Sequence, residues 1–71
     1  MAKRKFLIKA RRIDQVLKTL RYLRVLQVDL KEDLREAGIE PAQHPMMSHL
    51  DQATGFVQRL VDDDIPAANG L

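Results

Sequence analysis

The side chains that could support nucleophilic chemistry are few and lie in the middle of the chain. The sequence has one serine, Ser48, and two histidines, His44 and His49, and it has no cysteine. Ser48 precedes Asp51 by three residues, which is the spacing of a helix capping box with the shorter acid. A chain of 71 residues also has almost no room for a substrate pocket of roughly 300 Å³ or more. We therefore expect no enzymatic activity and no small-molecule substrate.

The same stretch contains the residue types that bind metals. These residues are His44, Met46, Met47, His49 and Asp51. The two histidines are five positions apart, so they do not share one face of a helix, and methionine is more often a pliable core residue than a ligand. The three aspartates at 62–64 lack the glycine and the later glutamate of a calcium loop. We expect neither a metal site nor a cofactor.

Charge divides the chain into a basic and an acidic part. Residues 1–28 contain nine Lys or Arg side chains against Asp14 alone, a net charge of +8, whereas residues 29–71 contain three against nine acidic side chains, a net charge of −6. Such a division predicts an acidic partner for the N-terminal half, or pairing of the two halves within the fold or between subunits.

A short apolar run inside the basic segment favours a protein partner. Residues 6–8 lie between lysines and suit an arm that adds to a sheet edge or fits an apolar groove of a larger acidic protein. We therefore predict a small regulatory protein, an adaptor or an inhibitor. The side chains expected to bind the partner are Lys5, Phe6, Leu7, Ile8, Lys9, Arg11, Arg12, Tyr22 and Val25.

The basic segment also supports an alternative hypothesis, a dimeric DNA-binding regulator. Residues 3–12 could neutralise several phosphates. If residues 5–9 form a strand that pairs with its copy in a second chain, the arrangement resembles the ribbon-helix-helix repressors, whose strand side chains enter the major groove. The chain departs from that plan because its first helix is expected to be about twice as long.

The chain is organised around a long amphipathic helix expected over residues 13–37. Its apolar side chains recur at alternating spacings of three and four, as in a coiled-coil seam, with Gln27 as the interruption. Tyr22, Val25 and Val28 lie outside this series and make the middle of the helix apolar nearly all round, which predicts coverage from several directions. The residues expected in a dimer core are Ile13, Val16, Leu20, Leu23, Gln27 and Leu30.

The start of this helix is ambiguous and its end is well marked. Residues 5–9 fit a strand or flexible arm and a backward extension of the helix equally well, and Asp14 offers an N-cap if the helix begins there. Gly38 supplies the left-handed residue after the helix, Ile39 the apolar residue that follows it, and Pro41 prevents continuation. Residues 38–45 are then a loop.

A second, shorter helix is expected from about Met46 or Ser48 to about Asp63. The prediction is therefore an all-α fold with a basic N-terminal arm (1–12), a helical hairpin (13–64) and a flexible tail (65–71). Helices of about 25 and 16 residues are about 37 and 24 Å long, so the second cannot cover the first. A second copy could cover the remainder, which predicts a homodimer packed as a four-helix bundle.

Size and hydropathy also bear on the oligomeric state and the cellular location of the chain. Short chains without disulfides commonly need a partner to bury enough surface. The sequence has no apolar run of about 18 residues and no apolar core of a signal peptide after its basic start. We expect a soluble cytoplasmic protein that does not act on a membrane.

Overall fold

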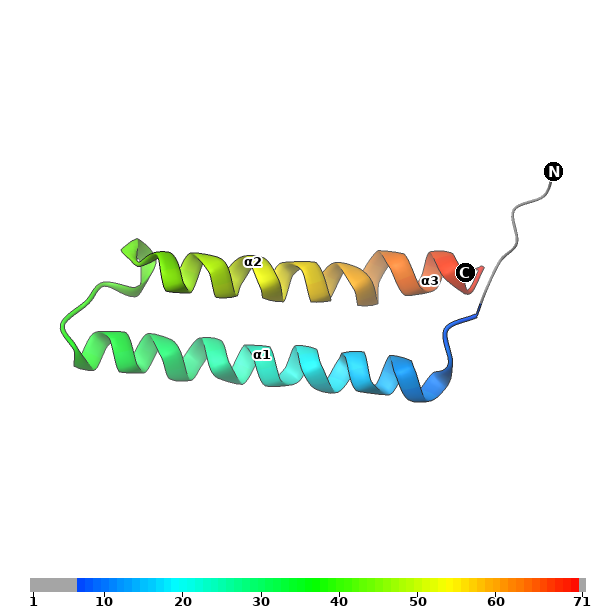
Figure 1. The fold of residues 1–71 in the computed structure, drawn as a ribbon, viewed down its shortest axis with the longest axis horizontal. Helices are drawn as coiled ribbons and strands as arrows, with labels where there is room; N and C mark the ends of the chain where they lie inside the picture. The colour runs from blue at the N-terminus through cyan, green and yellow to red at the C-terminus, as the bar shows by residue number, and fades with distance from the viewer. Residues whose placement is uncertain (1–6, 71) are drawn as a thin grey trace.

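The computed structural model describes residues 7–70, which form two antiparallel helical rods joined by a short loop (Figure 1). The first rod is α1, Ala10–Glu36. The second consists of α2, Pro45–Arg59, a π-helical turn, Leu60–Asp64, and α3, Ile65–Ala68, in direct succession. The predicted all-α helical hairpin is confirmed.

The beginning of α1 lies further back than Asp14. Lys9 is the N-cap residue in an extended conformation, and the helix starts at Ala10. Asp14 lies inside the helix and forms an ion pair of 3.0 Å with Lys18, so the suggestion that Asp14 caps the helix was wrong. Of the strand considered for residues 5–9, positions 5 and 6 lie outside the described residues, and residues 7–9 belong to no regular element.

The end of α1 has the geometry that the sequence predicts. Gly38 has a φ of 76°, in the left-handed region. Its N–H donates to the Arg35 carbonyl at 3.0 Å, and the Ile39 N–H donates to the Leu34 carbonyl at 2.8 Å. These two bonds form a Schellman motif and satisfy carbonyl groups that the helix end leaves free. Pro41 then begins a single 3₁₀ turn, Pro41–Gln43.

The start of α2 depends on His44 and not on Ser48. The His44 Nδ1 atom accepts a hydrogen bond of 3.1 Å from the Met46 N–H, and Pro45 is the first helical residue. Proline suits this position because the missing N–H would have no partner inside the helix. Ser48 lies within α2, so its predicted role as a cap is corrected.

This cap gives a testable prediction for helix stability. We expect His44→Ala to lower the free energy of unfolding by about 1 kcal/mol, because the first turn of α2 loses an acceptor for one of its free N–H groups. His44→Asn should retain most of the stability, since asparagine is a good N-cap residue. Urea unfolding of the three proteins measures both effects, and equal losses in the two variants would show that His44 acts other than as a cap.

The second rod is longer than the sequence predicts. Helical structure continues past Asp63 to Ala68, through a π-helical turn that directly precedes Ile65 and Pro66. A proline inside a helix removes one N–H bond and crowds a preceding carbonyl, and a wider turn at this point accommodates both effects. The Asn69 Oδ1 atom accepts a hydrogen bond of 2.8 Å from the Ile8 N–H. This bond joins the two segments of the chain at the end of the hairpin opposite the loop.

This length changes the argument for a dimer. The two rods contain 27 residues in α1 and 24 residues from Pro45 to Ala68, so at 1.5 Å per residue they are about 40 and 36 Å long. The second rod therefore runs beside nearly all of the first, and the premise that it is too short was wrong. Only the burial of side chains can then indicate a second copy.

Burial in the hairpin is sparse. Among the described residues, the buried apolar side chains outside the loop are Leu20, Leu34 and Met47, which expose 7%, 6% and 2% of their surface. Large apolar side chains elsewhere remain open to solvent, with Phe56 and Tyr22 each 66% exposed. Two helices side by side form one layer, and a helical domain normally needs a second layer to enclose a core.

Gly55 gives a second prediction. A Cβ atom placed on Gly55 would meet nothing within 4 Å. Close approach of another helix within the chain therefore does not require glycine here, and Gly55→Ala should raise the free energy of unfolding by up to about 1 kcal/mol through helix propensity. Thermal unfolding followed by circular dichroism checks this, and a destabilised variant would reveal a close neighbour at this position.

Candidate interaction surfaces

The contact between the rods is a row of residues spaced by seven on each helix. From α1 the row contains Leu20, Gln27 and Leu34, and from the second rod it contains Met47, Thr54 and Val61. The Gln27 side chain donates a hydrogen bond of 2.8 Å to the Asp51 carboxylate. The Thr54 hydroxyl is satisfied by the Leu50 carbonyl at 2.8 Å. We call these six residues the contact row.

Three positions after Leu20 and Gln27 on α1, and after Met47 and Thr54 on the second rod, the residues are apolar, whereas Asp64 follows Val61. Because the rods are right-handed helices that run antiparallel, this offset turns toward the same side of the hairpin on both. Leu23, Leu26, Leu30, Leu50 and Val57 are half-buried, and Leu60 is 38% exposed. We call these residues, three or six positions after the row, the apolar face: Leu23, Leu26, Leu30, Leu50, Val57 and Leu60.

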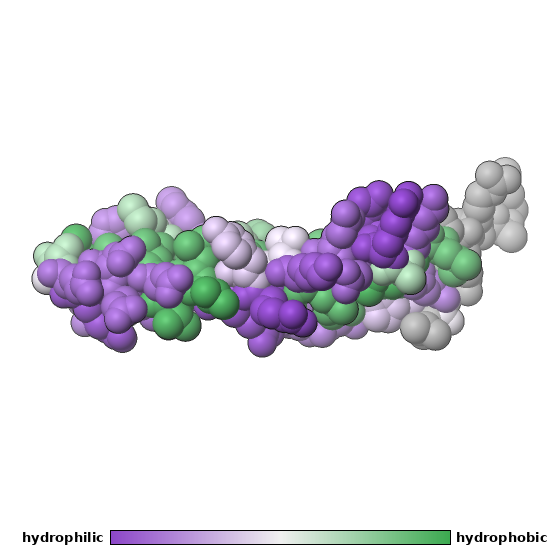
Figure 2. All heavy atoms as spheres, turned by 90° about the horizontal axis from the view of Figure 1, so that it is seen from below, coloured by the Kyte–Doolittle hydropathy of each residue, from purple (hydrophilic) through white to green (hydrophobic). Residues whose placement is uncertain are grey.

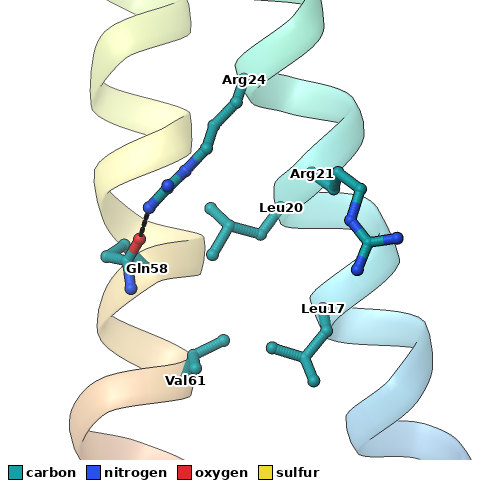
Figure 3. A pocket seen from close by; sticks show the side chains of 6 residues that line it. All are labelled: Leu17, Leu20, Arg21, Arg24, Gln58 and Val61. Atoms are coloured by element: carbon teal, nitrogen blue, oxygen red, sulfur yellow. Dashed lines mark hydrogen bonds between the residues drawn. The ribbon is translucent and has the colours of Figure 1, made fainter.

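Polar residues lie four positions after Leu20, Gln27, Met47 and Thr54, and they define the opposite, polar face. They are Arg24, Lys31, Asp51 and Gln58. Arg24 donates a hydrogen bond to the Gln58 side chain across the rods (Figure 3). Beside this bond lies an open groove of about 290 Å³, lined by Leu17, Leu20, Arg21, Arg24, Gln58 and Val61. In Figure 3 the leucines and Val61 point into the space between the rods, while Arg21 points away from them.

A row of basic side chains follows α1 along the polar face. Arg21 and Arg24 line the groove near the ends of the chain, and Lys31 and Arg35 line a second hollow near the loop. This row is not apparent from the sequence, because Lys31 and Arg35 are surrounded there by acidic residues. We call these four residues the basic row.

The side of α1 that points away from α2 combines apolar and charged side chains. Tyr22 and Val25 are 66% and 53% exposed there, and Val28, at the margin of the polar face, is 64% exposed. Figure 2 views the hairpin from this side, and green apolar atoms lie between purple hydrophilic ones along it. The structure therefore places Tyr22 and Val25 on an accessible outer edge of α1.

The predicted partner-binding residues at the N-terminus are only partly described. Leu7 is 75% exposed, while Ile8 is half-buried and donates its N–H to Asn69. Lys9, Arg11 and Arg12 are exposed, with the two arginines in the first turn of α1. Lys5 and Phe6 lie outside the described residues, so their predicted role has no structural counterpart here.

The predicted dimer-core residues lie in three places. Leu20 and Gln27 belong to the contact row inside one chain, and Ile13 and Val16 are half-buried along α1. Leu23 and Leu30 lie on the apolar face. Sequence reasoning missed the partners of that face on the second rod, Leu50, Val57 and Leu60, because it treated each helix separately.

Charged residues of the described part do little pairing with one another. The one ion pair between described residues joins Lys18 and Asp14, which are both exposed and lie on the same helix. Residues 7–70 therefore show no ion pair between the basic and the acidic part of the chain. The basic side chains of α1 remain available to an external partner.

The described residues contain no group of three or more His, Cys, Asp or Glu side chains placed to hold a metal ion. Within this same part of the chain, each helix is too short or too polar to cross a bilayer. No family model, curated protein or solved structure matches the chain.

Proposed function

We propose that this chain is a non-enzymatic regulatory protein that binds and modulates a larger protein as a homodimer. The observation that carries the proposal is the apolar face, where six large apolar side chains lie beside a core of only three. A hairpin that buries so little gains too little free energy to offset the conformational entropy of folding. A second layer of helices on the apolar face, in a four-helix bundle, supplies the missing burial.

The proposed dimer leaves the polar face and the outer edge of α1 for the larger partner. The basic row and Val25 lie away from the apolar face, whereas Tyr22 precedes Leu26 by one helical turn and lies at the edge of that face. Arginine and tyrosine are favoured at protein interfaces because each combines an apolar body with a polar group. The charge of the basic row favours an acidic surface on the partner.

Light scattering over a range of protein concentrations tests the dimer. We expect a mass of about twice the 8.2 kDa of one chain, together with a helical circular dichroism spectrum. Dissociation on dilution should reduce helicity, because the isolated hairpin has a small core. A single-chain mass with full helicity at every concentration would refute the dimer.

A photo-crosslinking side chain tests the surface for the larger partner. Placed at Val25, which is 53% exposed, it should capture a cellular protein, and placed at Gln52, an exposed residue on the other rod, it should not. Charge reversal by Arg21→Glu together with Arg24→Glu should reduce the capture if the acidic partner contacts the basic row. Equal capture from both crosslinking positions would indicate non-specific association.

DNA binding is the second candidate function, and the scarcity of ion pairs on α1 favours it. Exposed Lys9, Arg11 and Arg12 could neutralise phosphates. Fluorescence anisotropy of a mixed-sequence duplex, titrated at low and moderate salt, separates the two candidates. Binding with a steep negative dependence on salt concentration would support DNA, whereas no binding at low salt would leave the basic residues to a protein.

A further inference from the structure

We infer that the apolar face is occupied by a second copy of this chain in antiparallel orientation, with the loop of one hairpin over the chain ends of the other. The inference rests on the proposed homodimer and adds the surface and the orientation. It follows from the distribution of charge along the hairpin and from the symmetry of a closed dimer.

The apolar face is the surface on which a second copy fits best. It extends over both rods, and on each rod its residues lie three or six positions after a residue of the contact row. A twofold dimer uses one surface twice, so this surface must be complementary to itself. A surface of leucine and valine, with Asp33 at its edge six positions after Gln27, meets that requirement. The basic row on the polar face would instead place like charges opposite each other.

Charge differs between the two halves of the hairpin. The half with the chain ends, residues 7–23 and 57–70, contains six basic and four acidic side chains, a net charge of +2. The half with the loop, residues 24–56, contains three basic and six acidic side chains, a net charge of −3. Each hairpin is therefore positive at the chain ends and negative at the loop.

Two twofold arrangements bring the apolar faces together. If the twofold axis runs along the helices, both loops lie at the same end, and halves of like charge meet. If the axis crosses the helices, each loop lies over the other chain's ends, and halves of opposite charge meet. Both arrangements bury the same apolar residues, so the electrostatic interaction decides between them and favours the crossed axis.

The antiparallel arrangement has a consequence for the larger partner. The polar faces of the two chains point outward on opposite sides of the bundle, and each carries a complete basic row. The dimer then offers two equivalent surfaces to an acidic partner.

The distance between the two loops tests the orientation. The chain has no cysteine, so Gln43→Cys, at an exposed loop position, gives one spin label on each chain. In the antiparallel dimer the labels should be about 40 Å apart or more, because the rods separate them. With both loops at the same end, they should lie within roughly 25 Å, the width of about two helices. Pulsed electron paramagnetic resonance distinguishes these distances.

Salt provides an independent readout on the unlabelled protein. Attraction between the opposite halves weakens with ionic strength, so the dimer dissociation constant should rise several-fold from low to high salt. A long loop-to-loop distance with a rising dissociation constant supports the inference. A dimer with close labels, or one that tightens with salt, overturns the orientation and leaves the proposed homodimer intact. A monomer at all concentrations overturns both.

Discussion

Replacing Leu26 by aspartate is expected to dissociate the proposed homodimer. Leu26 lies six positions after Leu20, on the apolar face, and does not belong to the contact row between the rods. In the dimer, a carboxylate at this position would be buried without a partner, at a cost of several kcal/mol. We expect the dissociation constant, measured by sedimentation equilibrium, to rise by about a hundredfold or more.

Val28→Asp is the matched control for that variant. Val28 lies on the same helix, on the other side of the contact row, and is 64% exposed. The same change of an apolar side chain to a carboxylate should alter the dissociation constant little, because exposed substitutions usually change stability by about 0.5 kcal/mol or less. If the two variants weaken the dimer equally, the apolar face is not the interface.

Features that depend on local sequence were predictable. The apolar repeat of α1 predicts a long helix, and Gly38, Ile39 and Pro41 mark its end, since a Schellman motif requires only a few neighbouring residues. The hairpin also follows from local information, because a short loop between two helices makes them antiparallel neighbours. The predicted helix over residues 13–37 differs from α1, Ala10–Glu36, by three residues at its start and one at its end.

The extent of the second rod could not be predicted from local signals. The aspartates at 62–64 and Pro66 oppose a helix by the usual rules of charge and hydrogen bonding. The structure accommodates Pro66 after a π-helical turn and joins Asn69 to Ile8, 61 positions earlier in the sequence. A tertiary contact of this kind is invisible to periodicity and propensity.

The candidate surfaces were predictable in part for the same reason. The sequence predicts that Tyr22 and Val25 are covered in a multi-helix assembly, but within one hairpin both are exposed, because they lie outside the seam that faces the second rod. The apolar face, in contrast, requires both rods, because Leu23 and Leu30 join Leu50 and Val57 only once the register of the hairpin is known. Leu20 and Gln27 were predicted in the dimer core but lie between the two rods of one chain. The same apolar repeat can pack against a second copy or against the second helix of its own chain.

Leu20→Ala should strongly reduce the stability of the hairpin itself. Leu20 is 7% exposed and is one of three buried apolar side chains in the rods. Loss of a buried leucine side chain costs about 2–4 kcal/mol, from lost burial and from the cavity left behind. A chain of this size has little stability to lose, so we expect the variant to be largely unfolded at moderate temperature.

Leu17→Ala distinguishes loss of the core from loss of helix propensity. Leu17 is one turn earlier on α1, lines the open groove of the polar face and is 40% exposed. Both variants replace leucine by alanine in the same helix, so propensity changes equally, and Leu17→Ala should cost only about 1 kcal/mol because less apolar surface is lost. Circular dichroism at one protein concentration gives the folded fraction of both variants, and from it both losses. Equal losses would mean that Leu17 is also covered in solution, and the polar face would then be an interface too.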